Sequence, residues 1–145
     1  MDSLLIFIRK AVRFGLTLIV VAVVLNDGVR LASALSDGFS GLKAATNAAL
    51  DVAAVAPSDR DTAQAAATAA AASQGVRVVA YDHQVAGSGN TLRISVNVAV
   101  ETYAERTIVI APIVGLVRGT PSEEWYTDPG APIVLHQGKQ VSYFQ

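Results

Sequence analysis

The sequence contains no cysteine, and this absence removes several kinds of chemistry at once. Disulfide bonds, CxxC redox pairs, thiolate zinc sites and cysteine nucleophiles are all excluded. Charged residues are also scarce, at 16% of the chain, and the 11 Lys and Arg nearly balance the 12 Asp and Glu. A chain without a basic excess lacks the electrostatic footprint for DNA or RNA, so nucleic acid is not an expected partner.

Motifs for catalysis and cofactor binding are missing as well. The sequence has no GxSxG elbow, no phosphate-binding loop and no dinucleotide fingerprint. His83 and His136 lie on separate predicted strands and have no HxH or HExxH spacing. The acidic pair Glu123 and Glu124 falls in a predicted loop, where polar residues are common. We therefore predict a protein that is not an enzyme, with no cofactor, no metal and no identified small-molecule substrate.

What the sequence does have is apolar residues, which make up 52% of the chain. Residues 14–25 form an uncharged apolar run of 12 residues. A helix of that length rises about 18 Å, short of a hydrocarbon core of about 30 Å, whereas residues 4–25 rise about 33 Å. The longer segment predicts a single-pass membrane anchor, whose residues are Arg9, Lys10, Arg13, Phe14, Leu16, Leu18, Ile19, Val20, Val21, Val23, Val24 and Leu25.

The charges around this run predict an orientation. Arg9, Lys10 and Arg13 precede it, and Asp27 and Asp37 follow it. The positive-inside rule then places the N-terminus in the cytoplasm and the rest of the chain outside the cytoplasmic (inner) membrane. A cleaved signal peptide is the rival interpretation, because residues 32–34 (Ala-Ser-Ala) match a cleavage site. The helical pattern that continues through this site favours the uncleaved anchor.

Beyond the anchor, apolar residues recur at spacings of three and four, the period of one helix face. The stripe supplies four candidate interface residues, Leu31, Leu35, Phe39 and Leu42, before Pro57 ends the helix. Glycines at 38 and 41 predict a bend within it. An alanine-rich helix is predicted over residues 59–73, with Gly75 as its stop. Its small side chains suit either a helix that covers a sheet or a packing face for another subunit.

Two strands are predicted over residues 76–85 and 91–101, joined by a hairpin loop at 86–90. The second alternates cleanly and directs Leu92, Ile94, Val96, Val98 and Val100 to one face. A third strand is predicted at 105–110, a turn at 128–130, and a short strand at 133–135. The fold class is therefore α+β, pilin-like in order: a long N-terminal hydrophobic and amphipathic helix, an alanine-rich helix, and an antiparallel sheet of three to four strands. The predicted domains are 1–57 (anchor and stalk) and 58–145 (extracytoplasmic).

Two apolar features allow alternative interpretations. Residues 108–117 are interrupted by Pro112 and Gly115, so they are either core structure or an apolar patch that contacts membrane or a partner. Trp125 and Tyr126 lie in a proline-flanked loop and are either a recognition patch or an aromatic cap on the core.

The order of these features resembles the TadE/TadG-like proteins of tight-adherence (Flp) pilus systems. The residues that carry the resemblance, across about residues 11–120, are an Asp-Gly-x-Arg segment at 27–30, alanine-rich stretches at 44–49 and 63–75, and the strand at 92–100. Pilins and many pseudopilins carry a Gly followed by a Glu near the mature N-terminus. Here no Glu precedes Glu101, which argues against prepilin-peptidase processing.

The resemblance implies a pilin-like assembly component of a bacterial pilus or secretion system, anchored in the membrane or packed into a filament. Its partners would be membrane lipid and other pilus or secretion subunits, or copies of itself. The alternative is an exported or membrane-anchored extracytoplasmic binding domain, with a signal-peptide-like N-terminus, that presents the Trp125 loop.

Overall fold

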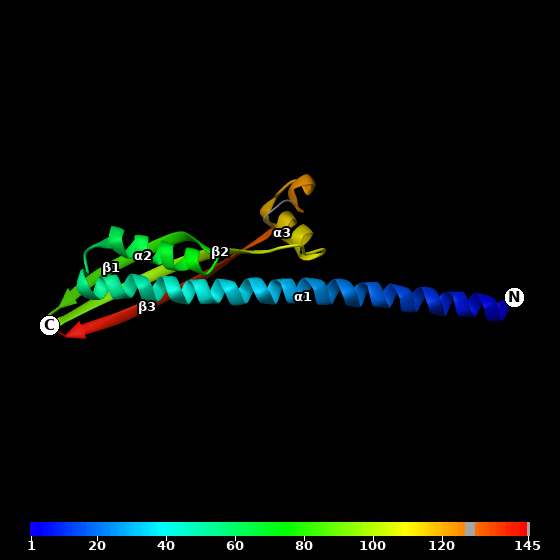
Figure 1. Ribbon diagram of the computed structural model, residues 1–145, viewed down its shortest axis with the longest axis horizontal. Coiled ribbons are helices and arrows are strands. Elements are labelled where there is room, and N and C mark those ends of the chain that lie inside the picture. Colours follow the sequence, from blue (N-terminus) through cyan, green and yellow to red (C-terminus); the bar gives the residue numbers. More distant parts are fainter. Residues whose placement is uncertain (127–129, 145) are drawn as a thin grey trace. The chain divides into compact units, whose positions relative to one another are not determined.

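The computed structural model describes residues 1–126 and 130–144 (Figure 1). Within these residues the protein is α+β, with three α-helices, one short 3-10 helix and a three-stranded antiparallel sheet. In chain order the elements are α1 (Asp2–Val55), α2 (Arg60–Ser73), β1 (Arg77–Ser88), β2 (Thr91–Ala104), α3 (Ile110–Arg118), η1 (Ser122–Glu124) and β3 (Ala131–Phe144).

The chain forms two compact units, and α1 contributes to both. Unit 1 consists of Met1–Ala32 and Ala104–Ala131, and unit 2 of Ser33–Tyr103 and Pro132–Gln145. Unit 1 is thus built from two segments far apart in the sequence, one of which is inserted between β2 and β3. The predicted domains divide the chain at a different place, after residue 57.

Unit 2 contains the hydrophobic core, in which the C-terminal half of α1 and α2 both pack against the sheet. From α1 the core takes Leu42, Ala45, Ala49 and Ala53, at 0–2% exposure. These positions recur every three or four residues, so they share one helix face. Because three of the four are alanine, α1 can approach the strands closely.

Glycines 38 and 41 do not interrupt α1, which is one helix from Asp2 to Val55. The two glycines are instead points of close approach. A Cβ added at Gly38 would lie 2.6 Å from Cδ1 of Leu135, and one at Gly41 would overlap the side chain of Val76. The cost of glycine in a helix, about 1 kcal/mol relative to alanine, is therefore offset by packing against the strands.

The alanine-rich helix α2 covers the sheet, which favours the first of its two interpretations. Ala63, Ala67 and Ala71 are fully buried in the core of unit 2. The helix begins where expected, because the side chain of Asp59 accepts a hydrogen bond of 3.1 Å from the backbone N–H of Thr62. It ends at Ser73, just before Gly75 in the left-handed conformation.

The sheet has the order β1-β2-β3, so β2 is the central strand. The β1–β2 hairpin turns at residues 89 and 90, where Gly89 has a φ of +58°. The alternation predicted for β2 is confirmed, because Ile94, Val96, Val98 and Val100 are all at most 2% exposed.

The remaining strand predictions need correction. Residues 105–110 do not form a third strand: β2 ends at Ala104 and the chain enters α3 at Ile110. The third strand is β3, which is much longer than the short strand predicted at 133–135. Of the turn predicted at 128–130, residues 128 and 129 lie outside the described residues.

A helix able to span a bilayer was expected between residues 4 and 25. In the described part of the chain, no helix is long and apolar enough to cross a membrane.

Candidate interaction surface

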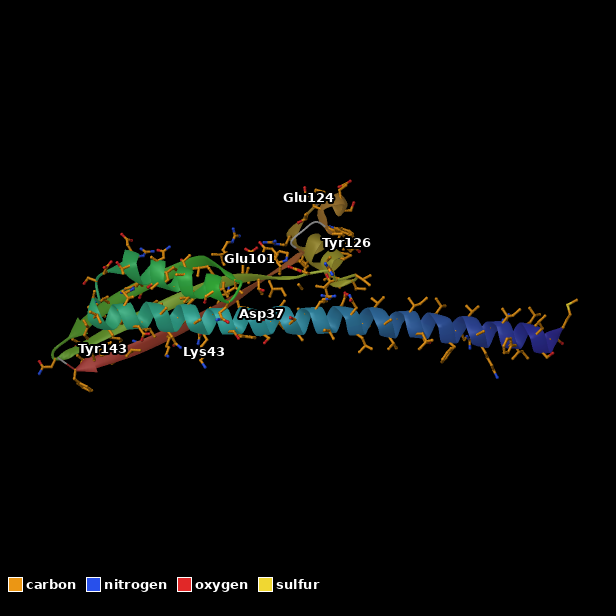
Figure 2. The ribbon with its side chains drawn as sticks, viewed as in Figure 1. Asp37, Lys43, Glu101, Glu124, Tyr126 and Tyr143 are labelled. Carbon is orange, nitrogen blue, oxygen red and sulfur yellow. The ribbon has the colours of Figure 1, made fainter. Side chains whose placement is uncertain are left out.

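The N-terminal half of α1 carries a continuous set of exposed apolar side chains, which we call the apolar arm (residues 4–29). Figure 2 shows its side chains projecting above and below the helix. Its large apolar residues are 47–69% exposed: Leu4, Leu5, Ile6, Phe7, Ile8, Val12, Phe14, Leu16, Leu18, Ile19, Val20, Val21, Val24, Leu25 and Val29. An exposed apolar surface of this extent marks a contact with lipid or with another protein.

Most of the residues predicted for the anchor belong to this exposed surface. The cations Arg9, Lys10 and Arg13 are exposed within it, and Val23 is half-buried. The arm therefore presents apolar side chains together with one cluster of positive charge. Such a helix suits an apolar environment that is bordered by polar or anionic groups.

The predicted interface stripe further along α1 is only partly available. Phe39 is 58% exposed and could contact a partner, whereas Leu31 and Leu35 are half-buried. Leu42 is 2% exposed and belongs to the core of unit 2, so it cannot serve as an interface residue. The helical period predicted one stripe, but its four residues have different surroundings in the structure, from buried Leu42 to exposed Phe39.

Asp27 organises unit 1, and no sequence pattern indicated this role. Its carboxylate is 5% exposed and accepts three backbone hydrogen bonds from the start of α3. The N–H of Ile108 donates to Oδ1 at 2.7 Å, and those of Val109 and Ile110 donate to Oδ2 at 2.7 and 2.9 Å. An aspartate within α1 thus caps a helix that begins more than 80 residues later.

The electrostatics of this cap favour the ionised carboxylate. Burial is the largest single influence and raises the pKa of Asp27. The hydrogen bonds from the three backbone N–H groups and from the side chain of Asn26 together outweigh burial and lower the pKa from its ordinary 3.8 to about 2. Asn26 also donates a hydrogen bond of 3.1 Å to the carbonyl of Arg106, which holds the loop before α3 against α1.

The local sequence explains why α3 needs a cap supplied from outside. Its N-cap residue is Val109, whose side chain cannot accept a hydrogen bond, and Pro112 in the first turn needs no N–H partner. The other end closes in the ordinary way at Gly119, which has a φ of +69° and donates to the carbonyls of Gly115 and Leu116. Asp27 therefore supplies the hydrogen-bond acceptor that the N–H groups of residues 108–110 do not find in their own segment.

Helix α3 buries its small residues and exposes its large ones. Ala111 and Gly115 are buried, and a Cβ at Gly115 would overlap the indole of Trp125. Ile113, Leu116 and Val117 are 55%, 69% and 83% exposed. Of the two interpretations of residues 108–117, the structure shows the exposed apolar patch.

The aromatic pair after α3 divides between inside and outside. Trp125 is half-buried against Gly115, and its Nε1–H donates a hydrogen bond of 3.0 Å to the carbonyl of Thr120. Tyr126 is 64% exposed, and its hydroxyl donates to the carbonyl of Ile108 at 2.9 Å (Figure 2). Trp125 therefore acts as an internal cap in unit 1.

His83 has a structural role in unit 2. Its Nε2 lies 2.6 Å from the carbonyl of Pro57, which can only accept, so this nitrogen carries the proton. Nδ1 then accepts from the hydroxyl of Tyr81 at 3.0 Å. Burial raises the pKa of Tyr81, which keeps the phenol protonated as this donor requires. The three groups join the linker after α1 to β1.

Chemistry-bearing side chains do not gather elsewhere among the described residues. No group of three or more His, Asp or Glu side chains in residues 1–126 and 130–144 could hold a metal ion. A shallow depression of about 280 Å³ on the sheet includes Asp82, Asn97 and His136 in its lining. Among the described residues, the apolar arm is therefore the strongest candidate for a surface that contacts a partner. Comparison with protein-family models, with curated proteins and with solved structures finds no match to this chain.

Proposed function

We propose that this protein is a non-enzymatic, pilin-like assembly component of the bacterial cell envelope, in a pilus or secretion system, that associates through the apolar arm. The observation that carries the proposal is the exposure of the arm's large apolar side chains. Each contributes roughly 1.5–3 kcal/mol when it is fully buried. Burial of several of them in one contact is enough to offset an association cost of about 4–15 kcal/mol.

The arm's partner is proposed to change during assembly. The arm first lies in the apolar layer of the cytoplasmic membrane, with Arg9, Lys10 and Arg13 near the headgroups. It then packs against the same arm of other copies or of related subunits, as the resemblance to TadE/TadG-like proteins implies. Unit 2 has its own core, so it remains folded whichever partner covers the arm.

The absence of cysteine provides a clean test, because a single introduced cysteine can form a disulfide only between molecules. Val21 lies in the arm and is 47% exposed, and Val55 is 87% exposed at the other end of α1. We expect full-length Val21→Cys, in detergent or in vesicles, to give covalent dimers on mild oxidation. Val55→Cys is the matched control and should stay monomeric.

A second substitution links the dimers to the arm's apolar character. Adding Leu18→Asp to Val21→Cys places a charge on the packing surface, and we expect it to abolish the covalent dimers. Equal dimer yields with and without Leu18→Asp, or from Val21→Cys and Val55→Cys, would refute assembly through the arm.

A further inference from the structure

Helix α3 is apolar in composition, and its large apolar side chains have no partner among the described residues. The two residues just before it, Ile108 and Val109, are 48% and 47% exposed, and Leu116 and Val117 within it are exposed further. Only alanine and glycine are buried on its inner side. A short helix normally buries its large residues, so this arrangement calls for an apolar neighbour outside the chain.

The position of α3 within unit 1 indicates which neighbour. Asp27 holds the start of α3 against α1 at a point two residues after Leu25, where the apolar run of the arm ends. Asp27 therefore joins the start of α3 to the end of the arm's apolar run. Whatever apolar layer receives the arm has its boundary at the same place.

The charges around α3 fit the boundary of a lipid layer. Arg118 is the only ionisable residue of the helix, and Glu105 and Arg106 precede it, all three exposed. The acidic residues Glu123 and Glu124 lie in η1, outside the helix. Apolar side chains flanked by charged residues, with the exposed aromatic ring of Tyr126 beside them, are the pattern of an element that lies in the headgroup region of a membrane.

We propose that α3 lies in the surface of a lipid bilayer, with Ile113, Leu116 and Val117 inserted among the lipids. The Asp27 cap then fixes the depth of the arm, because α3 cannot follow the arm into the apolar layer without exposing its cations to it. This inference rests on the proposed function only for the presence of a bilayer around the arm.

The single tryptophan of the chain is a native probe for this proposal, because Trp125 packs directly on Gly115 of α3. Full-length protein is reconstituted in vesicles of phosphatidylcholine and phosphatidylglycerol that contain a lipid labelled with nitroxide in the headgroup region. We expect Trp125 fluorescence to be strongly quenched by this lipid. A nitroxide near the end of the acyl chain should quench it much less.

Matched variants separate insertion of α3 from insertion of the arm. Leu116→Glu should reduce the quenching by headgroup nitroxide to the level of unlabelled vesicles, while the protein still floats with the vesicles through its arm. Val79→Glu is the control, because Val79 is a 41% exposed apolar residue of β1 in unit 2. In this variant Trp125 should be quenched by headgroup nitroxide as strongly as in the unmodified chain.

Two results would overturn the proposal. Protein that floats with vesicles but whose Trp125 is quenched only by aqueous iodide has α3 in solution. Protein whose Trp125 is shielded from both lipid nitroxide and iodide has α3 covered by another protein. In either case the disulfide yields of Val21→Cys, measured separately, still decide whether the arm mediates assembly. Failure of this inference can therefore be distinguished from failure of the proposed function.

Discussion

The two halves of α1 belong to one helix yet meet opposite surroundings. In the C-terminal half the buried face is mostly alanine, with Ala45, Ala49 and Ala53 at 0% exposure. In the N-terminal half the apolar residues are large, and Phe7 and Phe14 are 69% and 67% exposed. Where the neighbour is the protein's own sheet, small side chains permit close backbone approach. Where the described residues provide no neighbour, large side chains offer the area that an outside partner must cover.

A charge introduced into each half of α1 should reveal the largest difference between them, measured as the loss of unfolding free energy. Leu42→Asp puts an unpaired carboxylate into the core of unit 2, and we expect a loss of about 4 kcal/mol or more in unfolding free energy. Leu18→Asp, at 53% exposure, should change the unfolding free energy by no more than about 0.5 kcal/mol. Chemical denaturation of both variants tests this, and similar losses would show that the arm has internal packing.

Asp27 joins the two segments of unit 1, so its removal should destabilise unit 1 and leave unit 2 unchanged. Asp27→Ala leaves three backbone N–H groups without their acceptor, and we expect docking of α3 to weaken by about 2–4 kcal/mol. Amide hydrogen exchange at residues 108–110 should speed up accordingly, while exchange in β2 stays unchanged. Asp37→Asn, at an exposed aspartate in unit 2, is the control.

The same cap should respond to acid. Because the pKa of Asp27 is lowered to about 2, its contribution is fully present above the ordinary value of 3.8 and is lost as the pH falls from about 4 to 2. Protection of residues 108–110 should decline across that range in the unmodified chain. In Asp27→Asn the protection at these amides should be lower at every pH and flat between pH 4 and 2.

Glycine-to-alanine substitutions should change stability in opposite directions in the two halves of α1. Gly28 has no atom within 4 Å of an added Cβ, so Gly28→Ala should stabilise α1 by about 0.5–1 kcal/mol. At Gly41 the added Cβ overlaps Val76, so Gly41→Ala should destabilise unit 2 by about 1–2 kcal/mol despite its helix propensity. Thermal melts of each variant measure the sign, and adding Val76→Ala should restore much of the loss at Gly41.

Local patterns predicted the parts of the fold that local forces determine. The alternation of β2 follows from the side-chain period, and the extent of α2 follows from the helix propensity of its alanines and the stop at Gly75; both are confirmed. A helix across residues 31–52 also follows from its period.

Contacts between distant residues explain what the patterns missed. The β-branched sequence at 107–110 favours a strand, but the carboxylate of Asp27 turns it into a helix start. The glycines at 38 and 41 suggest a bend, but they serve the approach of Leu135 and Val76. Phe39 and Leu42 lie on one predicted stripe, and only the tertiary structure shows that Leu42 is inside.

The insertion of residues 104–131 between β2 and β3 has a consequence for the order in which the chain becomes structured. As the chain is synthesised, α1, α2 and the β1–β2 hairpin can associate early, because their partners lie close together in the sequence. The three N–H groups that bind Asp27 belong to Ile108, Val109 and Ile110, which are synthesised after the hairpin. The carboxylate of Asp27 therefore stays solvated until the hairpin is complete. The arm is thus available to chaperones or to lipid well before α3 docks beside it.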